Sequence, residues 1–386
     1  MKIAVVSPVL PPSWSGQAIL IYRLLKDRSP EEYCLISQED YAAAEDTAAA
    51  PKLAGRYHRL APWRQIPRGH FLDTVKRLNI YLLSRQIARI ARREQCSAIV
   101  AFSGNLNDLP ASLVASRILE VPCYAYVCDF YSYQQVGERA FAEQTEAKVL
   151  HGAAGVVVPN EFLRDELKRR YAVDSTVIYN PCDLQAYEAA PAFREHDGEQ
   201  RIVYTGAVYA ANYDALRNLI GAIELLGRSD IRLHLFTAQS PKKLRKAGIR
   251  GPVVFHEHVN VAEIPAIQKQ ADLLFLPLAF DSPYPEIIRT SAPFKMGEYL
   301  AARRPVLVHA PADSFITWYF RSHDCGFVVD ENDPAKLADG IKRLLCDTGL
   351  AQKLCERASE RARAEFSDEI SQARFAQLLE LAKGGV

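Results

Sequence analysis

Short apolar segments, separated by segments with helical periodicity, recur along the whole chain of 386 residues. Apolar runs of four to eight residues, rich in β-branched side chains, are typical of parallel strands buried on both faces, and the helices between them form right-handed βαβ crossovers. The runs occupy residues 2–7, 97–102, 123–128, 155–159 and 176–181, and then 201–206, 232–238, 252–259, 271–278 and 304–311. This pattern predicts an α/β protein built from two doubly wound, Rossmann-like parallel-sheet modules.

The two modules are predicted to meet in residues 179–200, a polar segment with two prolines and one glycine that lacks apolar periodicity. We place the boundary near Asp183, which gives an N-terminal domain of residues 1–183 and a C-terminal domain of residues 184–386. A chain of this length suits two domains, and ligands commonly bind in a cleft between domains. The final segment, to Leu381, is predicted to be helical and to pack back on the first domain.

Charge, cysteine content and hydrophobicity argue against nucleic-acid-binding, secreted and membrane-spanning proteins. The 47 basic and 46 acidic residues nearly cancel, which argues against nucleic acid as the main partner. The eight cysteines are scattered without a CxxC pair, as expected for reduced thiols. Neither a signal peptide pattern nor an apolar run long enough to cross a bilayer is present in the sequence. We therefore expect a cytoplasmic protein.

In each predicted module, one glycine turn follows the first strand. Gly16 ends the open loop SPVLPPSWSG after the first strand, and Gly206 follows RIVYT before a predicted helix. Glycine lets a ligand approach the backbone, and open α/β sheets bind ligands outside the carboxyl ends of their strands. Both turns are candidate diphosphate sites, although an ordinary loop at a helix start would look the same. Neither completes GxGxxG, which weighs against a dinucleotide-binding dehydrogenase.

Residues 282–311 carry the most informative motif. The segment from Ser291 to Lys295 is predicted to lie at a helix N-terminus, where free amides and the Lys295 ammonium would neutralise a diphosphate. Glu298, one turn later, would accept hydrogen bonds from ribose hydroxyls. The alternatives are a solvated lysine and a glutamate that caps the helix or pairs with Arg303 or Arg304.

The motif resembles that of the GT-B glycosyltransferases of family 4, also called group 1. Glu298-Tyr-Leu-Ala followed by Pro305 and Val306 matches the second half of the family's donor motif, in the variant P-x-K-x-x-E-Y-L-A. The Gly16 loop, Gly206, the YNPCD linker and a helix after Phe366 extend the likeness along nearly the whole chain. The resemblance implies the GT-B fold, in which two Rossmann-like domains face a central cleft.

The resemblance also implies an activity, the transfer of a sugar from a nucleotide diphosphate sugar with retention of configuration. Its donor site would comprise the loop and helix residues Gly16, Gly206, Arg289, Thr290, Ser291, Phe294, Lys295 and Glu298. Thr290 stands where the family carries its first glutamate, so Ser291 or Glu286 would substitute for that contact. After Gly206 the family's Arg and Lys are absent, which leaves the phosphate contacts to Lys295, Arg289 and backbone amides.

Asp129 follows the strand at residues 123–128 and corresponds to the aspartate of the family's His-Asp pair, with Cys128 in place of the histidine. We predict that it orients or deprotonates the acceptor, although an aspartate that caps a helix would occupy the same position.

A metal ion and a cofactor are not expected to be needed. The sequence has no Asp-x-Asp pair, and His256 and His258 lack a third ligand at a known spacing. We predict instead that these histidines are loop residues near the donor base, with backbone groups of Thr237 to Gln239.

Residues 63–93 combine basic and apolar side chains. A basic amphipathic helix lies well on anionic lipid, so peripheral membrane contact is one interpretation and an ordinary solvated helix is the other. The acceptor would be a glycan, a lipid-linked sugar or a small molecule, as in polysaccharide biosynthesis. Two other functions fit the same architecture: a nucleotide-sugar epimerase or hydrolase, and a non-catalytic nucleotide-sugar-binding protein.

Overall fold

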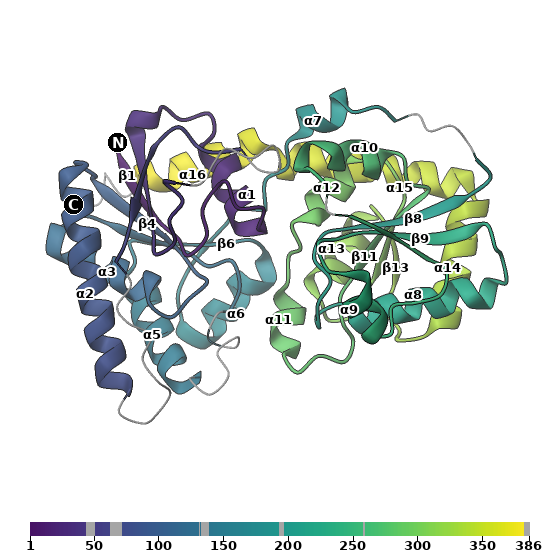
Figure 1. The fold of residues 1–386 in the computed structure, drawn as a ribbon, viewed down its shortest axis with the longest axis horizontal. Helices are drawn as coiled ribbons and strands as arrows, with labels where there is room; N and C mark the ends of the chain where they lie inside the picture. Colours follow the sequence, from purple (N-terminus) through teal and green to yellow (C-terminus); the bar gives the residue numbers. More distant parts are fainter. Residues whose placement is uncertain are drawn as a thin grey trace. The chain divides into compact units, whose positions relative to one another are not determined.

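The computed structural model describes residues 1–43, 51–61, 72–130, 132, 139–192, 197–257 and 259–381. The chain forms two compact units, one of Met1–Tyr179 with Ser371–Val386 and one of Asn180–Ile370. Each unit contains one parallel sheet with helices on both faces (Figure 1). The predicted α/β fold with two parallel-sheet modules is therefore confirmed.

The first unit contains a seven-stranded sheet in the order β3-β2-β1-β4-β5-β6-β7. The strands are β1 Ile3–Val6, β2 Tyr33–Ser37, β3 Arg56–Arg59, β4 Ala98–Phe102, β5 Cys123–Tyr126, β6 Gly155–Val158 and β7 Thr176–Val177. Strands β1, β2, β4 and β5 are buried at every residue, as their apolar sequences require. Strand β1 pairs with both β2 and β4, so the strand order reverses there and β1 lies at the switch point of the sheet.

Helices surround this sheet, and side-chain caps fix where two of them begin. The helices are α1 Gly16–Leu25, α2 Leu72–Arg93, α3 Asp108–Leu119, α5 Arg139–Gly152, α6 Glu161–Tyr171 and most of α16 Asp368–Leu381. Ser15 caps α1 by accepting the Ala18 N–H, and Asn160 caps α6 by accepting the Leu163 N–H. Helix α16 belongs to the first unit from Ser371 onward, where Gln372 donates to the Arg23 carbonyl at 2.7 Å.

The second unit contains a six-stranded sheet in the order β10-β9-β8-β11-β12-β13. The strands are β8 Gln200–Thr205, β9 Ile231–Phe236, β10 Val253–His256, β11 Leu273–Pro277, β12 Val306–His309 and β13 Phe327–Val329. Strand β8 pairs with both β9 and β11, which makes it the switch point. A ligand of this sheet is therefore expected beyond the carboxyl end of β8.

The helices of this unit are α7 Leu184–Ala189, α8 Tyr213–Leu226, α9 Pro241–Lys246, α10 Ile264–Lys269, α11 Pro285–Thr290, α12 Lys295–Ala301, α13 Phe315–His323, α14 Pro334–Cys346 and α15 Thr348–Arg361. Helices α8 and α14 pack together over an apolar core that includes Ile202, Leu219 and Leu337, all fully buried. Among the described residues, no helix combines the length and the apolar character needed to cross a membrane.

Candidate active site

The turn after β8 brings two of the predicted donor residues together. Gly206 directly follows the strand with a φ of +112°, a conformation that favours glycine. Its N–H donates to the Phe236 carbonyl at 2.9 Å, which anchors the turn to β9. A Cβ added to Gly206 would lie 3.5 Å from Cε and 3.6 Å from Nζ of Lys295. The lysine therefore lies directly over the glycine turn.

The Lys295 side chain is held in this position by a buried tyrosine. Its Nζ donates to Tyr204 Oη at 3.2 Å and lies 4.5 Å from the centroid of the Tyr204 ring. The tyrosine hydroxyl donates in turn to the Ala207 carbonyl at 2.6 Å and accepts from Asn212 Nδ2 at 3.0 Å. Because an ammonium carries three donor hydrogens, Lys295 keeps capacity for an anion. This geometry argues against the solvated lysine that the sequence also allowed.

A second tyrosine fastens α12 to the end of β8. Tyr299 is fully buried, and its Oη accepts a hydrogen bond from the Thr205 N–H at 3.1 Å. Burial raises the pKa of Tyr299 to about 12, so the hydroxyl stays protonated at neutral pH. From the sequence, Tyr299 was noted only as part of the family motif, without a role, and Tyr204 was not singled out. The sequence did contain a signal: each tyrosine lies in an apolar segment beside a motif, and a buried tyrosine hydroxyl needs a hydrogen-bond partner.

Glu298 lies one helical turn after Lys295 on α12 and is half-buried. Residues three apart on a helix share a face, so Glu298 lies on the same side of α12 as Lys295. Phe294 immediately precedes the helix and is also half-buried. The helix begins at Lys295, the last residue of the segment that was predicted to form its N-terminus.

The residues before α12 differ in exposure, and not all of them are accessible to a ligand as predicted. Arg289, in the last turn of α11, and Ser291 are half-buried. Thr290 is 1 % exposed, and its hydroxyl donates to the Glu286 carbonyl at 3.0 Å, so this residue lies in the protein interior. The amide of Ser291 already donates to the Ile288 carbonyl at 3.4 Å, so it is not the free amide that the prediction required.

The loops after β8 and β9 are fastened to each other. The Val208 N–H donates to Oε1 of Gln239 at 3.2 Å, and the Thr237 hydroxyl donates to the same oxygen. The predicted base-recognition segment from Thr237 to Gln239 therefore lies beside the Gly206 turn.

His256 was predicted to be a loop residue, and this is wrong, because it is the last residue of β10. Its ring stacks on Phe236 at 4.0 Å between centroids, and its Nε2 lies 3.0 Å from Nδ1 of His234. Burial lowers the pKa of both histidines. His258 lies outside the described residues. In the part of the chain that the structure describes, no cluster of three His, Cys, Asp or Glu side chains could hold a metal ion.

In the first unit, Gly16 is the first residue of α1 and follows the Ser15 cap. The loop before it is packed against the loop after β4, because a Cβ on Gly104 would lie 2.7 Å from Pro8 Cγ. Within the first loop, Gln17 donates to the Ser7 hydroxyl at 3.0 Å. Gly104 has a φ of +154° and was not singled out from the sequence. The backbone of Gly16 itself has no unusual conformation, so its predicted role remains a prediction.

Asp129 lies three residues beyond β5 at the carboxyl edge of the first sheet. Its side chain forms no hydrogen bond or ion pair with a described residue, and burial raises its pKa to about 7. The preceding Cys128 N–H donates to the Ser103 hydroxyl at 2.9 Å, which ties this turn to the end of β4. A carboxyl with a pKa near neutrality suits proton transfer. Residues 131 and 133–138, on which the capping alternative depends, lie outside the described residues.

Comparison with solved structures identifies the architecture. Sucrose-phosphate synthase from Thermosynechococcus elongatus superposes with a TM-score of 0.73 at 16 % identity and covers 100 % of both chains. HepE from Anabaena, solved with UDP and glucose, gives 0.71 at 15 % identity over 98 % of this chain and 99 % of that one. A trehalose 6-phosphate synthase from Burkholderia multivorans gives 0.70 at 14 % identity over 99 % and 97 %. The chain has the GT-B fold.

Sequence comparison finds a family match within the second unit. Residues 199–347 match the family model of group 1 glycosyl transferases. The matched segment contains Gly206, Lys295 and Glu298 and therefore the whole lysine-over-glycine arrangement. No curated protein matches the chain in sequence. The family match and the GT-B architecture support a glycosyltransferase activity.

Proposed function

We propose that this protein transfers a sugar from a nucleotide diphosphate sugar to an acceptor hydroxyl, and that Lys295 and the Gly206 turn bind the diphosphate. The observation that carries the proposal is the position of the Lys295 ammonium over an exposed glycine at the switch point of the second sheet. That position lies within the segment that matches group 1 glycosyl transferases.

The chemistry follows from the charge that develops during transfer. As the bond between the sugar anomeric carbon and the phosphate oxygen breaks, negative charge collects on the leaving diphosphate. An ammonium already held by Tyr204 stabilises that charge without reorganisation, and this is the main way in which such sites lower the barrier. In this proposal the cation replaces a metal ion, and the anomeric configuration is retained.

In this proposal, two further residues bind the two substrates. Glu298 binds the ribose hydroxyls of the donor, and Asp129 orients or deprotonates the acceptor hydroxyl. HepE, solved with UDP-glucose, supports a uridine nucleotide as the first donor to test.

A thermal-shift screen against UDP, GDP, ADP, CMP and their sugar conjugates, with and without magnesium, tests the donor site. One nucleoside diphosphate is expected to raise the melting temperature with no need for magnesium, since saturation at 100 times Kd stabilises by about 2.7 kcal/mol. Lys295→Ala is expected to weaken binding about 10- to 100-fold, the value of one charge-assisted hydrogen bond. Lys342→Ala, an exposed lysine on α14, is the matched control and leaves the shift intact.

The other functions predict different results in this screen and in an assay of donor turnover. If the wild type binds none of these ligands, the proposed donor site is contradicted and a non-catalytic role is favoured. The same holds if the Lys295→Ala variant binds them as well as the wild type does. Donor consumed at the full rate without acceptor indicates an epimerase or a hydrolase.

Glu298→Gln tests the contact with ribose. The substitution is expected to lower affinity for the preferred nucleoside diphosphate about tenfold, because a hydrogen bond to a charged acceptor is lost. Affinity for the 2′-deoxy or the 3′-deoxy analogue, whichever lacks the contacted hydroxyl, is expected to be equal in the wild type and the variant. Isothermal titration of both proteins with all three ligands measures this coupling. Glu360→Gln, on the exposed face of α15, serves as control, and an equal loss for all three ligands would disprove the ribose contact.

A further inference from the structure

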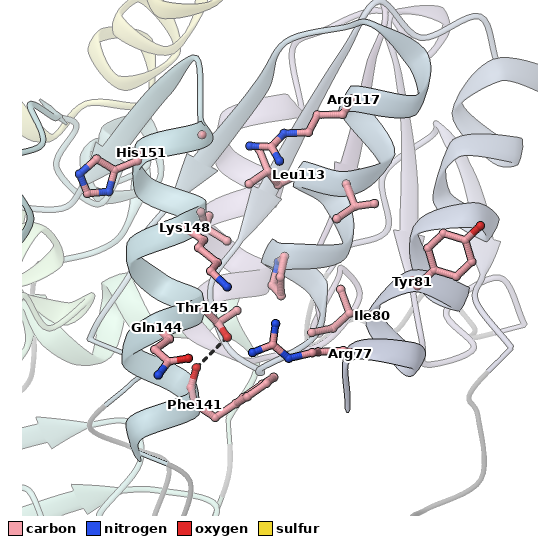
Figure 2. Close-up of a pocket in the computed structure, with 14 residues that line it drawn as sticks. Arg77, Ile80, Tyr81, Leu113, Arg117, Phe141, Gln144, Thr145, Lys148 and His151 are labelled. Carbon is pink, nitrogen blue, oxygen red and sulfur yellow. Dashed lines mark hydrogen bonds between the residues drawn. The ribbon is translucent and has the colours of Figure 1, made fainter. Parts of the chain in front are cut away.

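The first unit contains a cavity of about 520 Å³ that the proposed transfer does not use. It lies between α2, α3 and α5 (Figure 2), and its size is typical of small-molecule pockets. Its floor consists of buried apolar side chains, among them Ile80, Leu113, Phe141 and Val149. The cavity is therefore suited to a hydrocarbon group.

The rim of the cavity is cationic. Arg77 of α2, Arg117 of α3 and Lys148 of α5 are exposed, and Figure 2 shows their side chains extending over the space between the three helices. None of the three forms a hydrogen bond or ion pair with another described residue. The residues that line the cavity include no aspartate or glutamate.

An apolar floor under three uncompensated cations matches one kind of ligand better than others. A free anion would use the rim but not the floor, and a neutral apolar molecule would leave the positive charges unpaired. An amphiphile with a phosphate head and a hydrocarbon chain uses both, because guanidinium groups bind phosphate with two hydrogen bonds each.

The surface beside the cavity points to a lipid in a bilayer. Leu78, next to Arg77 on α2, and Tyr81, which also lines the cavity, are 45 % and 50 % exposed. Among the described residues only six large hydrophobic side chains are exposed, and two of them lie here. Apolar and aromatic side chains next to basic ones are typical of helices that lie in the headgroup region of a membrane.

We propose that the cavity between α2, α3 and α5 binds an anionic phospholipid of a membrane. The phosphate lies among Arg77, Arg117 and Lys148, one acyl chain lies on the apolar floor, and Leu78 and Tyr81 enter the headgroup layer. This proposal does not depend on the proposed transfer, since its residues are separate from Lys295, Glu298 and Asp129.

Co-sedimentation of the full chain with lipid vesicles tests this site. Vesicles of phosphatidylcholine with phosphatidylglycerol are expected to bind the protein, and vesicles of phosphatidylcholine alone are not. The triple variant Arg77→Gln/Arg117→Gln/Lys148→Gln is expected to lose affinity on the order of 100-fold, at about fivefold per basic residue near an anionic surface. The matched control Lys246→Gln/Arg250→Gln/Lys342→Gln removes the same charge from exposed positions of the second unit and is expected to bind within about threefold of the wild type.

Two further measurements separate this site from simpler explanations. Val114→Phe adds bulk to the cavity without a change of charge and is expected to weaken vesicle binding, with the melting temperature as a check on folding. Glycerol phosphate at millimolar concentration is expected not to compete with the vesicles. Equal losses in the two triple variants, no binding to anionic vesicles, or full competition by glycerol phosphate would each overturn the lipid site.

Discussion

Replacing Asp129 with asparagine is expected to lower the rate of sugar transfer by about 10²- to 10⁴-fold, the usual contribution of a group that accepts a proton in the transition state. Burial raises the pKa of the Asp129 carboxyl to about 7, and a group with a pKa near neutrality can accept a proton at physiological pH. The measurement is the initial rate with saturating donor and varied acceptor. Donor binding in the thermal-shift assay is expected to stay unchanged, because Asp129 belongs to the first unit and the proposed donor residues Gly206, Lys295 and Glu298 belong to the second.

The same carboxyl predicts how activity and stability depend on pH. The wild-type rate is expected to rise as the pH increases through 7, because the base acts only when ionised. Stability changes in the opposite direction. Between the unfolded pKa near 4 and the folded pKa the folded state binds more protons, so the free energy of unfolding falls as the pH rises. Asp129→Asn removes this penalty and is expected to melt at a higher temperature than the wild type at pH 8, with a smaller difference at pH 5.

The control for this variant is Asp339→Asn, on the exposed face of α14. It is expected to leave the rate, the pH profile and the melting temperature unchanged. An Asp129→Asn enzyme with a normal rate and a normal pH profile would exclude Asp129 as the base.

Gly206→Val is expected to abolish measurable donor binding and to destabilise the protein by about 1–3 kcal/mol. The strain arises because a β-branched residue rarely adopts a φ of +112°. The loss of binding has a separate cause: the new side chain would start 3.6 Å from the Lys295 ammonium and would cover the surface on which the diphosphate lies. Titration with the preferred nucleoside diphosphate measures the affinity, and chemical denaturation measures the stability.

Gly227→Val separates strain from obstruction. Gly227 ends α8 with a φ of +63°, and a Cβ there would meet nothing within 4 Å. This variant is expected to lose stability for the same backbone reason and to keep full affinity for the donor. If both variants lose affinity equally, general destabilisation explains the effect and the Gly206 turn is not the diphosphate site.

The sequence predicted the parts of the fold that depend on local pattern. Strands β1, β4, β5 and β11 are continuous apolar runs because both faces of each sheet are covered, and such runs are visible without any knowledge of contacts. The edge strand β3, with sequence RYHR, was not predicted, since an edge strand has polar residues and exposed ends. The nearby β2 was also missed, although its residues are all buried.

The candidate site was predicted only in part, for a physical reason. Lys295 and Gly206 were found because each belongs to a local motif at a strand end or a helix start. The contact of Lys295 with Tyr204 joins residues 91 positions apart, and no periodicity in one sequence specifies such a pair. The inward position of Thr290 likewise depends on the packing of α11, and its residue type alone does not reveal it.

The division of the first unit into residues 1–179 and 371–386 has a consequence during biosynthesis. Phe375 and Leu379, on helix α16, are 1 % and 2 % exposed. The residues against which they pack therefore stay exposed to solvent until α16 has been synthesised. Ribosomes add about 5–20 residues per second, and the whole of the second unit must be translated in between. The nascent first unit therefore waits on the order of 10–40 s with an uncovered apolar surface.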